Sequence, residues 1–130
     1  MADPPGPNAD DVAYLAGLAR ELDRPRYFAT LFAPERLRAD LFALYGFAAE
    51  TARIPDLVTD ATLGRIRLQW WRDSLEAALE REGGSGGDTP AVRAIASVVR
   101  RHALPLAPLK ALIDARSADL SSDPPPTLAD

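Results

Sequence analysis

The 130-residue sequence contains no cysteine, one histidine and one lysine. Without cysteine, the chain can form neither disulfides nor thiolate metal sites. The single histidine, His102, leaves no Ser-His-acid set for nucleophilic catalysis, and we expect it on the surface or at a helix end. No apolar run approaches the roughly 20 residues that span a bilayer. The net charge of −4 offers no basic surface for a nucleic-acid partner.

The N-terminal segment MADPPGPNADD has neither the basic start and apolar stretch of a signal peptide nor the arginine-rich face of a transit peptide. We therefore expect a cytoplasmic protein from a bacterium, with residues 1–9 as a disordered leader. The GGSGG at 83–87 predicts a flexible loop, because neither side of it could fold alone. A single helical domain is therefore expected over 10–130.

Apolar residues recur every three to four positions, and the alternating pattern of a strand does not occur. The sequence therefore predicts an all-α fold. Prolines, glycines and capping residues (Asp10 or Asp11, Asp60 and Thr89) set the expected helix boundaries. They give five or six helices, at about 10–22, 25–32, 34–54, 60–81, 89–99 and 109–120. Residues 127–130 resemble the start of another helix, so we expect the chain to be truncated at its C-terminus.

Carboxylates that bind one magnesium ion from a helix should lie three or four residues apart, so that they share a face. Glu50 and Asp56 are six residues apart, whereas Asp56 and Asp60 have suitable spacing but span a predicted loop. Neither pair makes a metal site unaided. Solvated surface charges are the simpler interpretation.

Arginines surround Trp70 and Trp71, among them Arg67 and Arg72. One interpretation is a solvated face beside buried tryptophans. The other is a contact with an anion or a membrane surface, because tryptophan and arginine together suit an interface. Arg72 and Glu76 are one helical turn apart, which predicts a solvent-facing ion pair.

The sequence carries a family resemblance in three segments: LFAPERLRADLFALYGFAAETARIPDLV at 31–58, GRIRLQWWRDSLEA at 64–77 and LIDARSADL at 112–120. In this order they resemble the squalene/phytoene synthase family, whose enzymes are all-α head-to-head prenyl transferases. The resemblance implies the N-terminal half of an isoprenoid-synthase-type helical barrel, with five to six antiparallel helices. Loss of the other half would leave an exposed apolar groove near Tyr45, Trp70 and Val99.

In the family's enzymes, the helix with the Ala-Leu-Tyr sequence continues into a DDxxD-type motif, whose carboxylates hold magnesium ions on the substrate diphosphate. Alignment on Tyr45 places Ala52, Arg53 and Asp56 at this motif. Only Asp56 then remains as a candidate metal ligand. Arg38 matches an arginine that the family uses near the diphosphate. The resemblance therefore implies a degenerate diphosphate site of Arg38, Tyr45 and Arg53.

The pattern E-x-A-x-x-x-D at 50–56, followed by RLQWW at 67–71, is similar to one branch of the family. That branch includes the mitochondrial complex I assembly factor of squalene/phytoene synthase type and its bacterial relatives. The similarity implies a protein without prenyl transferase activity and without a cofactor, which acts as a binding or assembly protein. Arg67, Trp70 and Trp71 are its candidate contact with a membrane surface or a protein partner.

A second hypothesis is a magnesium-dependent head-to-head prenyl transferase acting on farnesyl or geranylgeranyl diphosphate in isoprenoid, carotenoid or hopanoid biosynthesis. In that case Asp56 would hold the metal, and Arg38 and Arg53 would bind the diphosphate directly. A third hypothesis is a generic helical interaction domain. No residue is assigned as catalytic, and magnesium is expected only if the protein is active.

Overall fold

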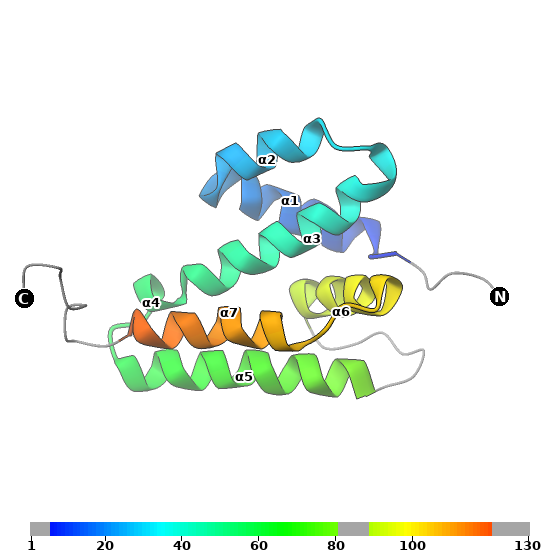
Figure 1. Cartoon of the computed structure of the whole chain (residues 1–130). Helices are drawn as coiled ribbons and strands as arrows, with labels where there is room; N and C mark the ends of the chain where they lie inside the picture. The colour runs from blue at the N-terminus through cyan, green and yellow to red at the C-terminus, as the bar shows by residue number, and fades with distance from the viewer. Residues whose placement is uncertain (1–5, 81–88, 121–130) are drawn as a thin grey trace, which may run out of the picture.

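The structure is a computed structural model that describes residues 6–80 and 89–120. These residues form seven helices and no strand, which confirms the all-α prediction. The helices are α1 (Ala9–Leu22), α2 (Arg24–Leu31), α3 (Glu35–Ala52), α4 (Ile54–Leu57), α5 (Ala61–Glu80), α6 (Pro90–His102) and α7 (Ala107–Ala118) (Figure 1). The predicted loop at 83–87 and the predicted helix start at 127–130 lie outside the described residues. None of the described helices is long and apolar enough to cross a membrane.

The start of α1 differs from the prediction. Asn8 is the N-cap, and its side-chain oxygen accepts a hydrogen bond from the backbone N–H of Asp10 at 2.7 Å. Asp10 and Asp11 lie in the first turn, where their negative charges interact favourably with the positive end of the helix dipole. The prediction that one of them caps the helix was wrong, because asparagine caps a helix as well as aspartate does and comes first in the chain. Asn8 and Ala9, assigned to the leader, therefore belong to the start of α1.

Two other helix starts agree with the sequence. The Asp60 side chain accepts a hydrogen bond from the backbone N–H of Thr62 at 2.8 Å, and Thr89 accepts one from Val92 at 3.3 Å. Both predicted caps are therefore confirmed. Pro90 follows Thr89 in the first turn of α6, where its missing N–H costs no helical hydrogen bond.

The short helix α4 was not expected. The proline at 55 ends α3 as predicted, but residues 54–57 continue as a separate helical turn instead of a loop. Proline is compatible with the first turn of a helix. Ile54, which is only 4% exposed, anchors this turn in the hydrophobic core. As a result, Asp56 is held on a helix immediately after α3.

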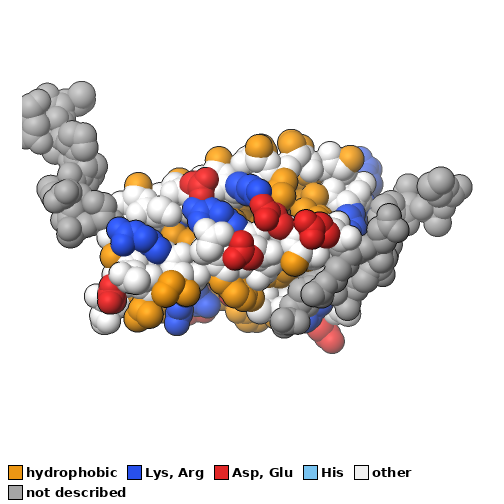
Figure 2. Space-filling view, turned by 90° about the horizontal axis from the view of Figure 1, so that it is seen from below, with side chains coloured by type: hydrophobic (Ala, Val, Ile, Leu, Met, Phe, Trp, Pro, Cys, Tyr) orange, Lys and Arg blue, Asp and Glu red, His pale blue; other side chains and the backbone are white. Residues whose placement is uncertain are grey.

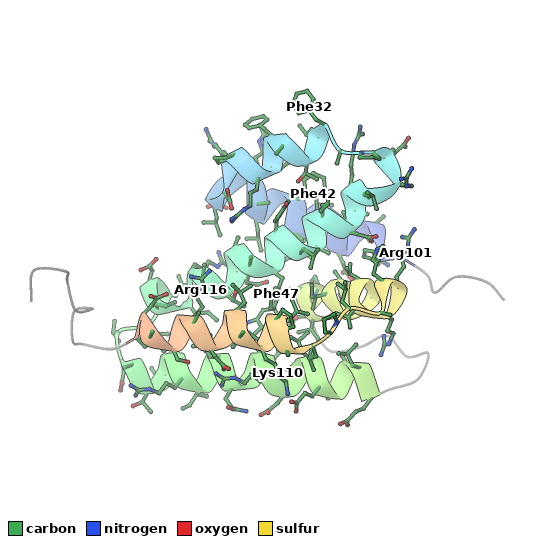
Figure 3. The ribbon with its side chains drawn as sticks, in the orientation of Figure 1. Phe32, Phe42, Phe47, Arg101, Lys110 and Arg116 are labelled. Atoms are coloured by element: carbon green, nitrogen blue, oxygen red, sulfur yellow. The ribbon has the colours of Figure 1, made fainter. Side chains whose placement is uncertain are left out.

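Helix α3 crosses the centre of the molecule, with α1 and α2 on one side and α5 and α7 on the other (Figure 1). Helix α5 runs antiparallel to its neighbour α7, whereas α3 and α7 run in the same direction (Figure 1). The core is a continuous cluster contributed by α1, α3, α5, α6 and α7, together with Ile54 of α4. At its centre Phe47 packs edge-to-face on Trp71, with ring centroids 5.3 Å apart (Figure 3). Burial of these large aromatic side chains contributes to the stability of the fold.

Ion pairs join α6 to α1 and to α3. The buried carboxylate of Asp11 accepts two hydrogen bonds from Arg93, at 3.0 and 2.9 Å. Asp40, also buried, lies 2.6 Å from His102 Nε2 and 3.7 Å from Arg101. His102 therefore lies at the end of α6, as predicted, and contacts a carboxylate of α3.

A second set of ion pairs joins α5 to α7. Arg72 pairs with Asp114, and Glu76 pairs with Lys110. The predicted Arg72–Glu76 pair within α5 was wrong, because each side chain has a partner of opposite charge on α7. Figure 2 shows this face, where acidic and basic side chains lie next to one another.

The close approach of α1 and α3 gives a test of the packing. A Cβ atom at Gly46 would lie 2.6 Å from the Leu15 Cβ atom and 2.9 Å from its carbonyl oxygen. We predict that Gly46→Ala lowers the free energy of unfolding by about 1–3 kcal/mol, because backbone cannot move aside cheaply. Gly17→Ala is the matched control. No atom lies within 4 Å of the new methyl group there, and we expect stabilisation of about 0.5–1 kcal/mol. Urea unfolding measures both, and equal effects would contradict the close contact.

The Asp11–Arg93 pair gives a second test. Asp10 and Asp11 share the first turn of α1, but only Asp11 is buried and paired with Arg93. We predict that Asp11→Asn lowers the free energy of unfolding by about 1–2 kcal/mol, since it leaves the guanidinium without its carboxylate. Asp10→Asn should cost less than about 0.5 kcal/mol, because it loses only the interaction with the helix dipole. Thermal unfolding in which both variants lose the same stability would argue against the pair.

Candidate functional site

Two cavities are lined in part by Arg53, the residue that connects α3 to α4. The first, which we call the tryptophan cavity, has a volume of about 370 Å³ and is lined by Glu50, Arg53, Ile54, Leu57, Ile66, Arg67, Trp70 and Trp71. The second, which we call the arginine cavity, has a volume of about 240 Å³ and is lined by Leu22, Asp23, Arg26, Ala48, Ala49, Ala52, Arg53, Asp56 and Arg116. Arg53 is common to both.

The wall of the tryptophan cavity is mainly apolar. Trp71 is buried, whereas Trp70 is 42% exposed, so only one of the two tryptophans is buried as the simpler interpretation expected. Their rings meet edge-to-face with centroids 5.5 Å apart. Leu57 and Ile66 are more than half exposed at the rim. The structure therefore brings Arg67, Trp70 and Trp71 together around one cavity.

Among the described residues, Glu50 is the one acidic side chain on the wall of the tryptophan cavity. One of its carboxylate oxygens accepts a hydrogen bond from the Tyr14 hydroxyl at 3.5 Å, and the other is buried without a hydrogen-bond partner among residues 6–80 and 89–120. Burial raises the pKa of Glu50 above its usual range, against the opposing effects of the Arg53 charge and the Tyr14 hydrogen bond. Burial, together with the Glu50 charge, also raises the pKa of Tyr14. Glu50 therefore favours its neutral form more than an exposed glutamate does.

The arginine cavity holds opposite charges close together. Asp23 accepts a hydrogen bond from Arg26 at 2.8 Å, and the Arg26 guanidinium lies 5.7 Å from the centre of the Tyr45 ring. Arg116 reaches the cavity from α7 and lies between α7 and the end of α3 (Figure 3). Three guanidinium groups and two carboxylates line this cavity, with Asp56 the second carboxylate.

The residues of the predicted diphosphate site are spread along α3. Arg38 lies near its start, where its Nε donates a hydrogen bond to the carbonyl oxygen of Ala33 at 3.0 Å. Arg53 follows 15 positions later, which corresponds to about 22 Å along a helix. Tyr45 lies about halfway between them and faces α2 through Arg26. The structure brings Arg53 and Asp56 together but leaves Arg38 at the other end of the helix.

In the part of the chain that the structure describes, Tyr45, Trp70 and Val99 do not share the predicted apolar groove. Val99 is 7% exposed and packs in the core on α6, and Tyr45 contributes to neither cavity. The reason is that α6 turns its apolar face inward, against α1, α3 and α5. Of the three residues, only Trp70 lies at an accessible apolar cavity.

The sequence profile of the family described as squalene/phytoene synthase matches residues 19–130. The chain belongs to this family. It is similar to proteins named "NADH dehydrogenase (ubiquinone) complex I, assembly factor 6": it is 32% identical to that of Bos taurus and 30% to that of Homo sapiens, each over 82% of this chain and 31% of the relative. The Drosophila melanogaster homolog is 27% identical over 84% of this chain and 34% of the relative. The chain thus spans about a third of the length of these relatives, and no solved structure matches it significantly.

Membership of the squalene/phytoene synthase family suggests a magnesium site at the motif position after α3. The described residues at this position do not fit a magnesium site. Ala52 and Arg53 supply no oxygen ligand, and Asp56 is the single carboxylate at the motif position. In the described parts of the chain, no three histidine, cysteine, aspartate or glutamate side chains could together hold a metal ion. Magnesium binds through several carboxylate, phosphate and water oxygens. A guanidinium beside Asp56 opposes such binding by charge repulsion.

Sequence reasoning missed several residues of both cavities in this family member. Asp23, Arg26 and Arg116 lie far from Asp56 in the sequence and reach it only through the packing of α2 and α7 on α3. No local pattern points to them. Glu50 belongs to the family pattern, but its hydrogen-bond partner Tyr14 lies 36 residues earlier in the sequence. The sequence signal that could have pointed to a buried Glu50 is the position of this carboxylate at the end of the apolar stripe of α3.

The raised pKa of Glu50 predicts how stability depends on pH. The folded state holds the Glu50 proton more tightly than the unfolded state does, so the contribution of Glu50 to the free energy of unfolding falls as pH rises from about 4 through the raised pKa. Glu50→Gln removes this proton. We therefore expect the stability of the variant, relative to the wild type, to increase across this range and then to level off.

Urea unfolding between about pH 4 and about pH 8 measures this difference. Tyr14→Phe provides a second variant, since loss of the hydroxyl removes a hydrogen bond that favours the charged carboxylate. In the Tyr14→Phe background, the fall in stability should extend to higher pH. A constant difference between Glu50→Gln and the wild type at all pH values would show that Glu50 is not perturbed by burial.

Proposed function

We propose that this protein has no prenyl transferase activity and acts as a binding or assembly protein, whose process is the assembly of complex I. The observation that carries the proposal is the guanidinium of Arg53 at the position where the family's enzymes need a carboxylate. Departure of diphosphate requires neutralisation of its charge, which magnesium supplies in those enzymes. A single carboxylate between arginines offers the metal no comparable set of oxygens.

The relatives support the same proposal. The curated proteins that it resembles, from mammals to Drosophila melanogaster, are named as complex I assembly factors. The partner of this chain is then a protein or a membrane surface of the assembly process, contacted in the cytoplasm. Arg67, Trp70 and Trp71 are the proposed contact residues, because Trp70 and its neighbours at the rim are exposed and apolar.

The absence of prenyl transfer is tested on the complete protein. We expect no release of diphosphate from farnesyl or geranylgeranyl diphosphate with magnesium present, and no effect of Asp56→Asn on this background. Product analysis by chromatography and a diphosphate release assay provide the measurement. Magnesium-dependent turnover that Asp56→Asn abolishes would contradict the proposal and favour the alternative, a prenyl transferase with an unusual motif.

The assembly role is tested in a deletion strain of the source organism. The amount of assembled complex I, measured on native gels stained for NADH oxidation, should fall in the deletion strain and recover with the wild type or with Asp56→Asn. Arg67→Glu should restore less, whereas Arg65→Glu, a change of the same charge on the same helix but outside both cavities, should restore fully. Full assembly in the deletion strain would rule out the role.

A further inference from the structure

The outer side of α2 carries exposed apolar side chains. Phe28 is 52% exposed and Leu31 is 41% exposed, and Phe32, in the turn that follows the helix, is 89% exposed. Their spacing of three and four residues places them on one side of the helix. Thr30 is the one buried residue of α2. We call Phe28, Leu31 and Phe32 together the α2 apolar face.

The α2 apolar face protrudes from the molecule. Phe32 lies at the end of the molecule opposite α5, and its ring points away from the body of the protein (Figures 1 and 3). Neither the tryptophan cavity nor the arginine cavity is lined by a residue of this face. A protruding apolar surface has no hollow that the side chain of a protein partner could fill. It suits insertion into the head-group region of a bilayer, where its apolar side chains leave water.

The backbone of the turn after α2 is compatible with such an insertion. The N–H groups of Phe32 and Ala33 donate hydrogen bonds to backbone carbonyl oxygens of α2, at 3.1 and 3.0 Å. The Nε atom of Arg38 donates to the carbonyl oxygen of Ala33 at 3.0 Å, and Pro34 has no N–H group. Backbone N–H groups without partners are costly away from water. From Phe32 to Pro34, the turn presents no such group.

The charges beside the α2 apolar face favour an anionic surface. Arg24 lies four residues before Phe28, on the same side of α2, and Arg36 follows the turn in α3. Both arginines are exposed, and in the described part of the chain neither of them forms an ion pair. Residues 20–38 contain five arginines and three acidic residues, although the net charge of the whole chain is −4. This end of the molecule is therefore basic.

We propose that the α2 apolar face inserts into the surface of a bilayer that contains anionic phospholipids, with Arg24 and Arg36 at the level of the phosphate groups. Arginines near the surface attract anionic head groups, and burial of the phenylalanine rings adds apolar contact. A second copy of the chain fits less well, because a two-fold contact through this face would bring the basic ends of both copies together. The inference does not depend on the assembly role, and it places the lipid contact on α2 rather than at Trp70.

A fluorophore at a single position tests the contact directly. Residues 1–130 contain no cysteine, so Phe32→Cys provides one labelling site in the complete protein once any cysteine elsewhere in it is replaced by serine. With an apolar, environment-sensitive label, its emission should shift to the blue and rise at least about twofold on addition of phosphatidylcholine vesicles with about 30% phosphatidylglycerol. Leu63→Cys is the matched control, because Leu63 is exposed on α5 and lines neither cavity. Its label should not respond.

Unlabelled variants separate the apolar contribution from the charged one. In sedimentation with the same vesicles, Phe32→Ser should bind at least about tenfold more weakly than the wild type, and Arg24→Gln about fivefold more weakly. Leu63→Ser and Arg65→Gln make the same kinds of change at exposed positions of α5, and their affinity should stay within about twofold of the wild type. Helical circular dichroism equal to that of the wild type verifies that each variant is folded.

The inference is overturned if the label at position 32 does not respond to the vesicles, if the labels at 32 and 63 respond equally, or if Phe32→Ser binds as tightly as the wild type. Equal binding to vesicles of phosphatidylcholine alone would contradict the role of the arginines. A response at position 32 that needs no vesicles and grows with protein concentration would also overturn the inference, and would assign the face to a contact between copies of the chain. None of these results decides the assembly role, which rests on complex I levels.

Discussion

The close contact between α1 and α3 at Gly46 fixes the rotation of α3, and with it the direction of every residue towards its C-terminal end. Only a residue without a Cβ atom allows the backbone of Leu15 to approach this closely. Once Gly46 and Phe47 face α1 and the core, the helical repeat directs Thr51 and Ile54 inward as well. The positions between these residues then face the cavities: Glu50 lines the tryptophan cavity, Ala52 lines the arginine cavity, and Arg53 lines both.

This orientation of α3 determines where Arg53 lies. It connects α3 to α4 and lines both cavities, so one guanidinium influences two different environments. In the arginine cavity it adds to a cluster in which carboxylates and guanidiniums offset each other. In the tryptophan cavity it is one of two positive charges beside a single half-buried glutamate. Among the described residues, the two cavities therefore offer more guanidinium groups than carboxylates.

Local patterns in the sequence predicted most of the helices, because prolines, glycines and capping residues act within a few positions of each boundary. Thr89 and Asp60 are examples, whereas Asn8 shows that two adjacent acids can be mistaken for the cap that precedes them. Helix α4 was missed because its formation depends on burial of Ile54 in a core that the local sequence does not reveal.

In the candidate site, too, local sequence features could be predicted, whereas features that depend on tertiary packing could not. Arg67, Trp70 and Trp71, which were grouped by residue type as one candidate contact, line the same cavity. The ion pairs of Arg72 and Glu76 could not be predicted, since their partners lie 42 and 34 residues away on α7. In the same way, Tyr14 reaches Glu50 and Arg116 reaches the arginine cavity only through tertiary packing.

The central claim is that the motif position at the end of α3 does not bind magnesium together with diphosphate. Calorimetric titration of the complete protein with magnesium and inorganic diphosphate tests this most directly, with Asp56→Asn as the reference. We predict the same heats for the wild type and the variant, equal to those of the two ions mixing in buffer. Saturable, magnesium-dependent binding of diphosphate by the wild type that is lost in Asp56→Asn would contradict the account.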